Sequence, residues 1–310
     1  MQNSNRHIDI YETVTNKIIE HLEKGVVPWQ QPWSGGEPPQ NLISKKPYRG
    51  INVLLLNTLG YSQNHFLTFH QIKELGGSVK RGEKAQIVMF WKQLERDNDK
   101  GEKERIPFLR YYTVFNISQC TGIPESKLPK LNEIKHEPIK ECEEILSKMP
   151  NKPEIKHELN RAFYNKAQDF INMPKPEIFN SSESYYATLF HEIVHSTGHE
   201  KRLNRKELLE SRGMRSDNYA LEELTAEMGS SFLCNMTGIE KDNIDNSASY
   251  INSWLERLKN DKKFIFYASS QAQKSVDFVL DVRERELDIV GREEELEKLR
   301  VSKIDIELSR

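Results

Sequence analysis

Apolar residues recur at helical spacing at the start of the chain. Over residues 8–24 they stand three or four positions apart, and Gly25 follows as a stop signal, so this stretch predicts an amphipathic helix. The segment FLTFHQIKELGG then predicts a short helix that two glycines end. The segments AQIVMFWKQL and RYYTVFNISQC are rich in β-branched and aromatic residues and flank a charged turn, which predicts a β-hairpin. We therefore expect an α+β domain in the first part of the chain.

The pattern changes in the middle of the chain. Five prolines fall between residues 122 and 153 around one short helical stretch, and this favours a linker over residues 124–153. Beyond it, the segment RAFYNKAQDFINMP predicts strands. Helical spacing then returns in four segments, which are residues 184–198, 219–237, 248–259 and 269–280.

The chain length supports two domains, because 310 residues suffice for two units that each bury a core of their own. We expect an α+β fold with an N-terminal domain over residues 1–123 and a C-terminal domain over residues 154–282. A charged tail over residues 283–310 follows.

Composition excludes several classes of protein. With 36% hydrophobic and 30% charged residues, the chain has the composition of a soluble globular protein. No apolar run approaches the roughly 20 residues that a membrane helix needs. The N-terminus has neither the basic start nor the apolar stretch of a secretory signal, so we expect a cytoplasmic protein with no membrane partner. Cys120, Cys142 and Cys234 are far apart and form no CxxC pair, which argues against disulfides and against a cysteine zinc site.

The charge distribution is more informative than the net charge of −2. Residues 1–120 hold 16 Lys and Arg and 12 Asp and Glu, a net of +4, so the remaining residues carry −6. A nucleic-acid site, if present, is therefore expected in the first part of the chain.

The HEIVH segment from His191 to His195 is the most specific chemical signal. Two histidines four positions apart lie on one helical face, where both imidazoles can bind one Zn²⁺ or another divalent ion such as Mn²⁺. Glu192 stands beside the first histidine, where its carboxylate can take a proton from water at the metal. The alternative is a surface helix with two unrelated histidines, but the apolar flanks favour a buried helix.

A catalytic zinc needs a third protein ligand. The metzincin pattern is excluded, because Lys201 stands where its third histidine belongs. His199 is a minor candidate, since three ligands so close along one helix end need an unusual turn. The segment YALEELTAEMGSSFL is another source, because Glu223 and Glu227 stand four apart on one face of an otherwise apolar helix. Helical geometry puts the adjacent Glu222 on the exposed side.

This arrangement resembles the gluzincin pattern, in which an acidic residue follows the glutamate ligand by four positions. The resemblance implies that Glu223 is the ligand and that Glu227 orients a metal-bound histidine. The spacing also allows the reverse assignment. Tyr219 is the candidate for stabilising a developing oxyanion, with His199 and Tyr185 as further candidates. The segment NKAQDFINMP is expected to offer a strand edge to an extended peptide.

The N-terminal part combines aromatic and basic residues. Aromatic rings stack on unpaired bases and cations meet phosphates, so the combination suits single-stranded DNA. The candidate residues are Trp29, Trp33, Lys45, Lys46, Tyr48, Arg49, Lys80, Arg81 and Lys84. The alternative is that the tryptophans fill the domain core and the lysines are ordinary solvated side chains.

The chain resembles the ArdC-type antirestriction proteins of mobile elements. The strings that carry the resemblance are KPYRGINVLLL, FLTFHQIKELGGSVKRGEKAQIVMFW, YYTVFNISQCTGI, YYATLFHEIVHSTGHEKRLNR and YALEELTAEMGSSFL. The resemblance reaches to about residue 282 and implies an N-terminal domain that binds single-stranded DNA and a C-terminal zincin-like metallopeptidase domain. It also implies protection of incoming plasmid DNA from host restriction enzymes.

These observations predict metal-assisted hydrolysis of DNA-bound proteins such as restriction enzymes, with Glu192 as the proton acceptor. Two alternatives stand beside this prediction. One is a protein without protease activity that protects DNA by covering it and uses the metal structurally, and the other is a protease that removes proteins crosslinked to DNA.

Overall fold

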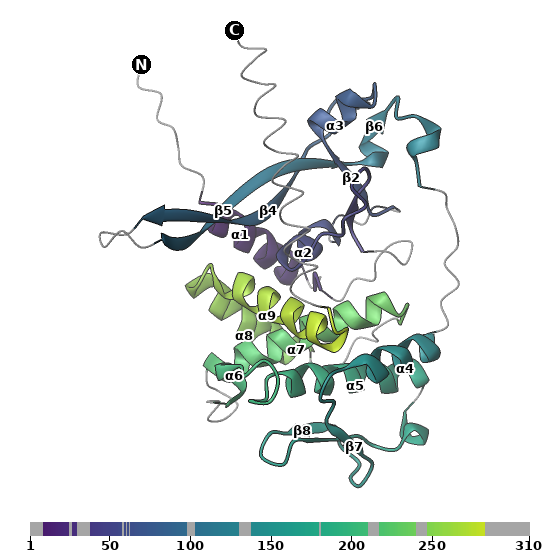
Figure 1. Ribbon diagram of the computed structural model, residues 1–310, viewed down its shortest axis with the longest axis vertical. Helices are drawn as coiled ribbons and strands as arrows, with labels where there is room; N and C mark the ends of the chain where they lie inside the picture. The colour runs from purple at the N-terminus through teal and green to yellow at the C-terminus, as the bar shows by residue number, and fades with distance from the viewer. Residues whose placement is uncertain are drawn as a thin grey trace.

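The fold was analysed in a computed structural model of the chain (Figure 1). It describes residues 9–24, 27–29, 38–57, 59, 61, 63–97, 103–129, 138–179, 181–209, 217–239 and 247–282. The predicted tail over 283–310 lies outside these residues. Among the described residues, no helix has the length and apolar character needed to cross a bilayer.

The N-terminal part combines α-helices with short and long strands. Its elements are α1 (Ile10–Glu23), β1 (Gln40–Asn41), α2 (Ile51–Asn57), β2 (His65–Thr68), α3 (Phe69–Glu74), β3 (Ser78–Val79), β4 (Gln86–Asp97), β5 (Lys103–Asn116) and β6 (Cys120–Thr121). Four of the strands form one sheet in the order β1-β2-β5-β4, and β3 pairs with β6. The helix expected over residues 8–24 and the hairpin are confirmed, the latter as the antiparallel pair of β4 and β5.

The short helix begins later than the sequence predicts. Residues His65–Thr68 form β2, and α3 starts only at Phe69. Thr68 explains the boundary, because its hydroxyl accepts a hydrogen bond from the Gln71 amide while the Gln71 side chain accepts one from the Thr68 amide. This reciprocal cap fixes where the extended strand turns into a helix.

The C-terminal part is mainly helical. Its elements are α4 (Pro138–Lys148), β7 (Glu154–Lys156), β8 (Phe163–Asn165), β9 (Phe170–Asn172), α5 (Ser182–Thr197), α6 (Lys206–Leu209), α7 (Asp217–Met236), α8 (Ser247–Asn260) and α9 (Phe264–Val279). The four helices expected from spacing correspond to α5, α7, α8 and α9. Helix α5 contacts both α4 and α7, and α7 in turn contacts α9 (Figure 1).

The small sheet corrects one expectation about substrate binding. Its order is β7-β9-β8, so β9 pairs with a strand on each side and offers no free edge within the described residues. The segment NKAQDFINMP therefore does not provide an edge along β9. Sequence periodicity could not reveal this, because β7, the parallel neighbour of β9, comes from residues before the segment.

Helix α4 falls inside the region predicted as a linker. Its residues Cys142, Ile145 and Leu146 are buried in the main core, and the Tyr186 hydroxyl of α5 donates to Glu143 at 2.5 Å. Pro138 begins the helix, a position that suits proline because the amide there needs no helical partner. The proline that suggested an interruption thus begins a packed helix. Cys120, Cys142 and Cys234 are free and buried.

The main hydrophobic core is shared between the two parts of the chain. Trp29 packs against Trp254 of α8 with ring centroids 5.4 Å apart, and Tyr11 of α1 packs against Phe266 of α9 at 4.8 Å. Among the described residues, two smaller clusters are confined to the N-terminal part. The expectation of two separate cores is therefore wrong, because apolar surface of α1 is buried against the C-terminal helices.

Candidate metal centre

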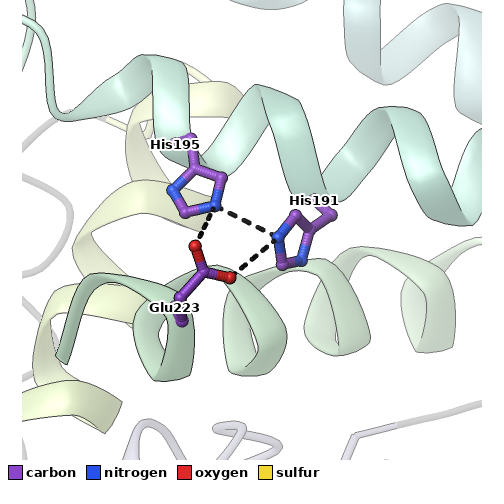
Figure 2. A group of neighbouring side chains, drawn as sticks. All are labelled: His191, His195 and Glu223. Atoms are coloured by element: carbon purple, nitrogen blue, oxygen red, sulfur yellow. Dashed lines mark hydrogen bonds and ion pairs between the residues drawn. The ribbon is translucent and has the colours of Figure 1, made fainter. Parts of the chain in front are cut away.

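Helix α5 carries the two histidines on the side that faces α7. It begins at a cap in which the Ser181 hydroxyl accepts a hydrogen bond from the Ser184 amide at 3.1 Å. Most of its residues are buried, which agrees with the expected apolar flanks. His191 and His195 lie one turn apart and direct their rings toward the neighbouring helix (Figure 2).

Helix α7 adds a carboxylate to the two imidazoles. The Nε2 atoms of His191 and His195 are 3.1 Å apart, and the Glu223 oxygens lie 3.6 Å from the first and 3.7 Å from the second (Figure 2). In a tetrahedral zinc site with bonds of about 2.1 Å, donor atoms stand about 3.4 Å apart. Two nitrogen donors and one oxygen donor at these separations fit a divalent metal ion. Among the described residues, this is the one such cluster.

The two other glutamates of α7 face the remaining imidazole nitrogens. An oxygen of Glu227 lies 3.6 Å from His191 Nδ1, whereas Glu222 Oε1 lies 3.0 Å from His195 Nδ1, within hydrogen-bond distance. Glu223 is thus the carboxylate that points to both Nε2 atoms. Glu227 instead faces the Nδ1 side of the His191 ring, opposite the Nε2 atom.

Glu222 is buried, with 3% of its surface exposed, so the prediction that it points to solvent is wrong. Helix α7 lies between α5 and α9 and is buried on several sides, which the simple two-sided helical pattern does not anticipate. Arg205 shares this environment and bonds to Glu222 through Nε at 2.9 Å and Nη2 at 2.5 Å. The signal in the sequence that could have indicated such a partner is a third glutamate in a helix that has no clear polar face to expose it.

The electrostatics of the centre favour a positive charge. Burial by itself disfavours protonated His195, but Glu223 and Glu222 outweigh it and raise the pKa of His195 to about 9. For Glu223, burial raises the pKa, but the charges of His195 and His191 outweigh it and lower the pKa to about 2. The pKa of Glu222 is also lowered to about 2, against the effect of burial, chiefly by Arg205. A metal ion that binds this centre must therefore displace a proton from His195.

The remaining candidates occupy different positions. Glu192 is buried, and the half-buried Tyr219 forms a side-chain hydrogen bond with Glu223. His199 does not join the cluster, since its Nδ1 accepts from the Lys201 amide at 3.2 Å. The Tyr185 hydroxyl lies 3.1 Å from His157 Nε2 and is engaged there. The structure thus brings Tyr219, and neither His199 nor Tyr185, into contact with the Glu223 carboxylate.

The aromatic residues predicted to stack on DNA are in the core. Trp29 is 1% exposed against Trp254, and Tyr48 is buried against Phe66, so neither ring has a free face. The stacking prediction is wrong for both, because packing between the two parts of the chain covers Trp29 and a smaller N-terminal cluster covers Tyr48. Trp33 lies outside the described residues.

The predicted basic residues are mainly at the surface. Lys45, Lys80, Arg81 and Lys84 are exposed, and Lys46 is half-buried. Arg49 differs from them, because its guanidinium forms an ion pair with Asp277 of α9.

The fold and the donor set define a zincin-like protein. Residues 140–271 match the family described as zincin-like metallopeptidase, and residues 8–115 match the family described as the N-terminal domain of anti-restriction factor ArdC.

Solved structures of similar chains lead to the particular family. The antirestriction ArdC protein from plasmid R388 is 38% identical, and its metal-free structure has a TM-score of 0.71 over 88% of this chain and 97% of that one. Its Mn(II)-bound structure has a TM-score of 0.72 over 88% and 98%. This chain belongs to the ArdC family of antirestriction proteins.

Two further relatives come from bacteria. Uncharacterized protein y4eC of Sinorhizobium fredii (strain NBRC 101917 / NGR234) is 35% identical over 87% of this chain and 91% of its own length. DNA primase TraC of Escherichia coli is 34% identical over 89% of this chain, but the match spans only 27% of that protein.

Proposed function

We propose that this protein binds single-stranded DNA through its N-terminal domain and protects incoming mobile-element DNA from host restriction enzymes. We further propose that the C-terminal domain is a metallopeptidase that cleaves DNA-bound proteins such as those enzymes. Family membership supports the first proposal, and the convergence of His191, His195 and Glu223 supports the second.

In this proposal His191, His195 and Glu223 hold Zn²⁺ or Mn²⁺, the latter being the ion in the R388 relative. When bound, such an ion supplies Lewis-acid chemistry that makes water acidic enough to lose a proton near neutral pH. Glu192 accepts this proton and returns it to the leaving amine. The Tyr219 hydroxyl, now donating toward Glu223, is the group that donates to the developing oxyanion. Glu227 holds the ring of His191 in orientation.

Glu192→Gln tests the peptidase proposal. The variant removes the proton acceptor and keeps the shape of the side chain, so metal content should stay unchanged while cleavage of a DNA-bound restriction enzyme is lost. A matched control is Glu183→Gln, because Glu183 lies in the first turn of the same helix, away from the cluster. Full protection of plasmid entry by Glu192→Gln would contradict the peptidase proposal and favour protection by covering the DNA.

Exposed cations are the proposed DNA contacts. Since Trp29 and Tyr48 are buried, the proposal rests on the exposed Lys45, the exposed group formed by Lys80, Arg81 and Lys84, and the half-buried Lys46. Contacts of this kind go to phosphates, which makes binding dependent on salt and tolerant of sequence.

Neutralising three cations tests this surface. The triple variant Lys80→Gln, Arg81→Gln, Lys84→Gln should bind single-stranded DNA more weakly. It should also lower the slope of log affinity against log salt by about 2, since each phosphate contact contributes about 0.7. Three exposed lysines of the other domain, Lys148, Lys152 and Lys175, provide a control triple of the same charge change. An equal effect of both triples would remove the N-terminal group from the binding site.

A further inference from the structure

A buried ion pair lies directly behind one of the metal ligands. Glu222 Oε1 is 3.0 Å from His195 Nδ1, and both oxygens of this carboxylate also accept hydrogen bonds from Arg205. Glu222 and Arg205 are each only 3% exposed. The carboxylate therefore has no freedom to turn away from the imidazole.

Arg205 is itself fixed by three helices. Its Nη2 donates to the Val194 carbonyl at 2.9 Å near the end of α5, and its Nη1 donates to the Thr197 hydroxyl at 2.5 Å. The same Nη1 donates to the Ser275 hydroxyl of α9 at 2.8 Å, while Glu222 belongs to α7. The guanidinium thus joins the helix that carries the histidines to two neighbouring helices.

Stability alone gives little reason for this pair. Two buried charges lose their hydration, and an apolar pair of similar volume is often as stable or more stable. The geometry gives another reason. A carboxylate that accepts from Nδ1–H fixes the tautomer in which Nε2 carries a lone pair, and His195 Nε2 is the atom that faces Glu223.

We infer that Glu222, held in place by Arg205, is the positioning residue for His195, fixing the ring with Nδ1–H toward α7 and Nε2 toward the metal. Glu227 faces His191 at a longer distance, 3.6 Å, so the two carboxylates flank the cluster unequally. This inference rests on the proposed metal site. It assigns Glu222 no contact with substrate.

A charge-free double variant separates positioning from stability. Glu222→Leu combined with Arg205→Met removes both buried charges together and leaves neither unpaired. The double variant should stay folded, with a Tm near that of wild type, yet bind Zn²⁺ about 10- to 100-fold more weakly in competition with a chelator. The spectrum of the Co²⁺-substituted protein should change as well, because the ligand field at His195 changes.

Two further variants complete the comparison. Glu222→Gln keeps an oxygen that can accept from Nδ1–H, so it should lose less affinity than the double variant. Asp169→Asn is the matched control, because Asp169 also pairs with a buried arginine, Arg202, but lies outside the cluster. Its metal affinity should equal that of wild type. Two results would overturn the inference. One is that Asp169→Asn weakens Zn²⁺ binding as much as the Glu222 variants do. The other is that folded Glu222 variants keep the wild-type affinity.

A measurement on the unaltered protein decides the question if the double variant does not fold. Long-range ¹H–¹⁵N correlation spectra of the Zn²⁺-loaded protein should show His195 protonated at Nδ1 and metallated at Nε2. Metallation at Nδ1 would refute the assignment. Failure of the wild-type protein to bind Zn²⁺ would instead remove the proposed site itself, and with it the reason for positioning His195.

Discussion

At the scale of single residues, three glutamates of α7 divide their contacts among the imidazole nitrogens. Glu223 faces both Nε2 atoms, Glu227 faces His191 Nδ1, and Glu222 bonds to His195 Nδ1. Three side chains of the same type, all glutamates, therefore have three different environments on one helix. Only the position of each carboxylate relative to the rings distinguishes a candidate ligand from a group that orients one.

Substitution of two glutamates distinguishes the ligand from its neighbour. Glu223→Gln removes a charged donor from the cluster and should weaken Zn²⁺ binding more than Glu227→Gln, for which about a 10- to 100-fold loss is expected. Chelator competition on the two folded variants measures the difference. The reverse order of affinities would assign the ligand role to Glu227.

Asp169 gives a dependence of stability on pH. Burial by itself raises its pKa, but hydrogen bonds from Arg202 and Tyr164 lower the pKa from 3.8 to about 2. Because the folded pKa is below the unfolded one, this stabilisation is complete above about pH 5 and is lost as pH falls toward 2.

Asp169→Asn should therefore make the loss of stability in acid shallower. Between pH 5 and 2, the difference in slope should not exceed about 1.4 kcal/mol per pH unit, the value for one proton. Urea unfolding at a series of pH values gives both slopes. Identical slopes would mean that the carboxyl has the same pKa in the folded and unfolded chains.

At the scale of elements, the site depends on the close approach of α5 and α7. A Cβ added at Gly229 of α7 would lie 2.9 Å from both methyl groups of Val194 on α5. Val194 directly precedes His195, and Gly229 lies two residues beyond Glu227. The glycine thus sets the distance between the helices that carry the donor atoms.

Gly229→Ala should push these helices apart. Alanine favours a helix by about 1 kcal/mol over glycine, but overpacking against two methyl groups costs about 1–3 kcal/mol, so a net loss of stability is expected. Zn²⁺ affinity should fall as well, because Glu223 moves with α7. Adding Val194→Ala should restore part of both losses in a double-mutant cycle. Strictly additive effects would show that the two residues do not limit the approach of the helices.

At the scale of the whole molecule, the N-terminal part is attached to the C-terminal helices by apolar and polar contacts. Beyond the packing of Trp29 on Trp254, the Thr15 hydroxyl donates to the Lys262 carbonyl at 2.8 Å. The Gly50 amide donates to Gln273 of α9 at 3.1 Å. With a common core of this kind, we expect the two parts to unfold together.

Trp29→Ala should therefore lower the stability of the whole molecule. Removal of a buried tryptophan ring costs about 3–5 kcal/mol, so the urea midpoint should fall while the unfolding transition remains single. The fraction that stays folded should bind single-stranded DNA as wild type does. Weaker DNA binding by a fully folded variant would return Trp29 to the DNA site.

Several features could be predicted from local sequence because they depend on neighbours along the chain. The spacing of His191 and His195 places them on one helical face wherever the helix lies. The hairpin of β4 and β5 was likewise predictable, since its residues favour strands and its partners are close in sequence. Thr68 shows a local signal that the prediction overlooked, because threonine followed three residues later by glutamine is the sequence signature of a capping box, and this cap divides a segment whose composition suggested one helix.

The sequence by itself determined the fold class, the two imidazoles and a helix with carboxylates suited to complete a metal centre. Only the tertiary structure decided which glutamate faces which nitrogen, that Glu222 is buried against Arg205, and that Trp29 belongs to a core shared between the two parts of the chain. The physical reason is that helical periodicity fixes the direction of a side chain relative to its own axis. Its exposure depends on the elements that pack around that axis, and these come from distant parts of the chain.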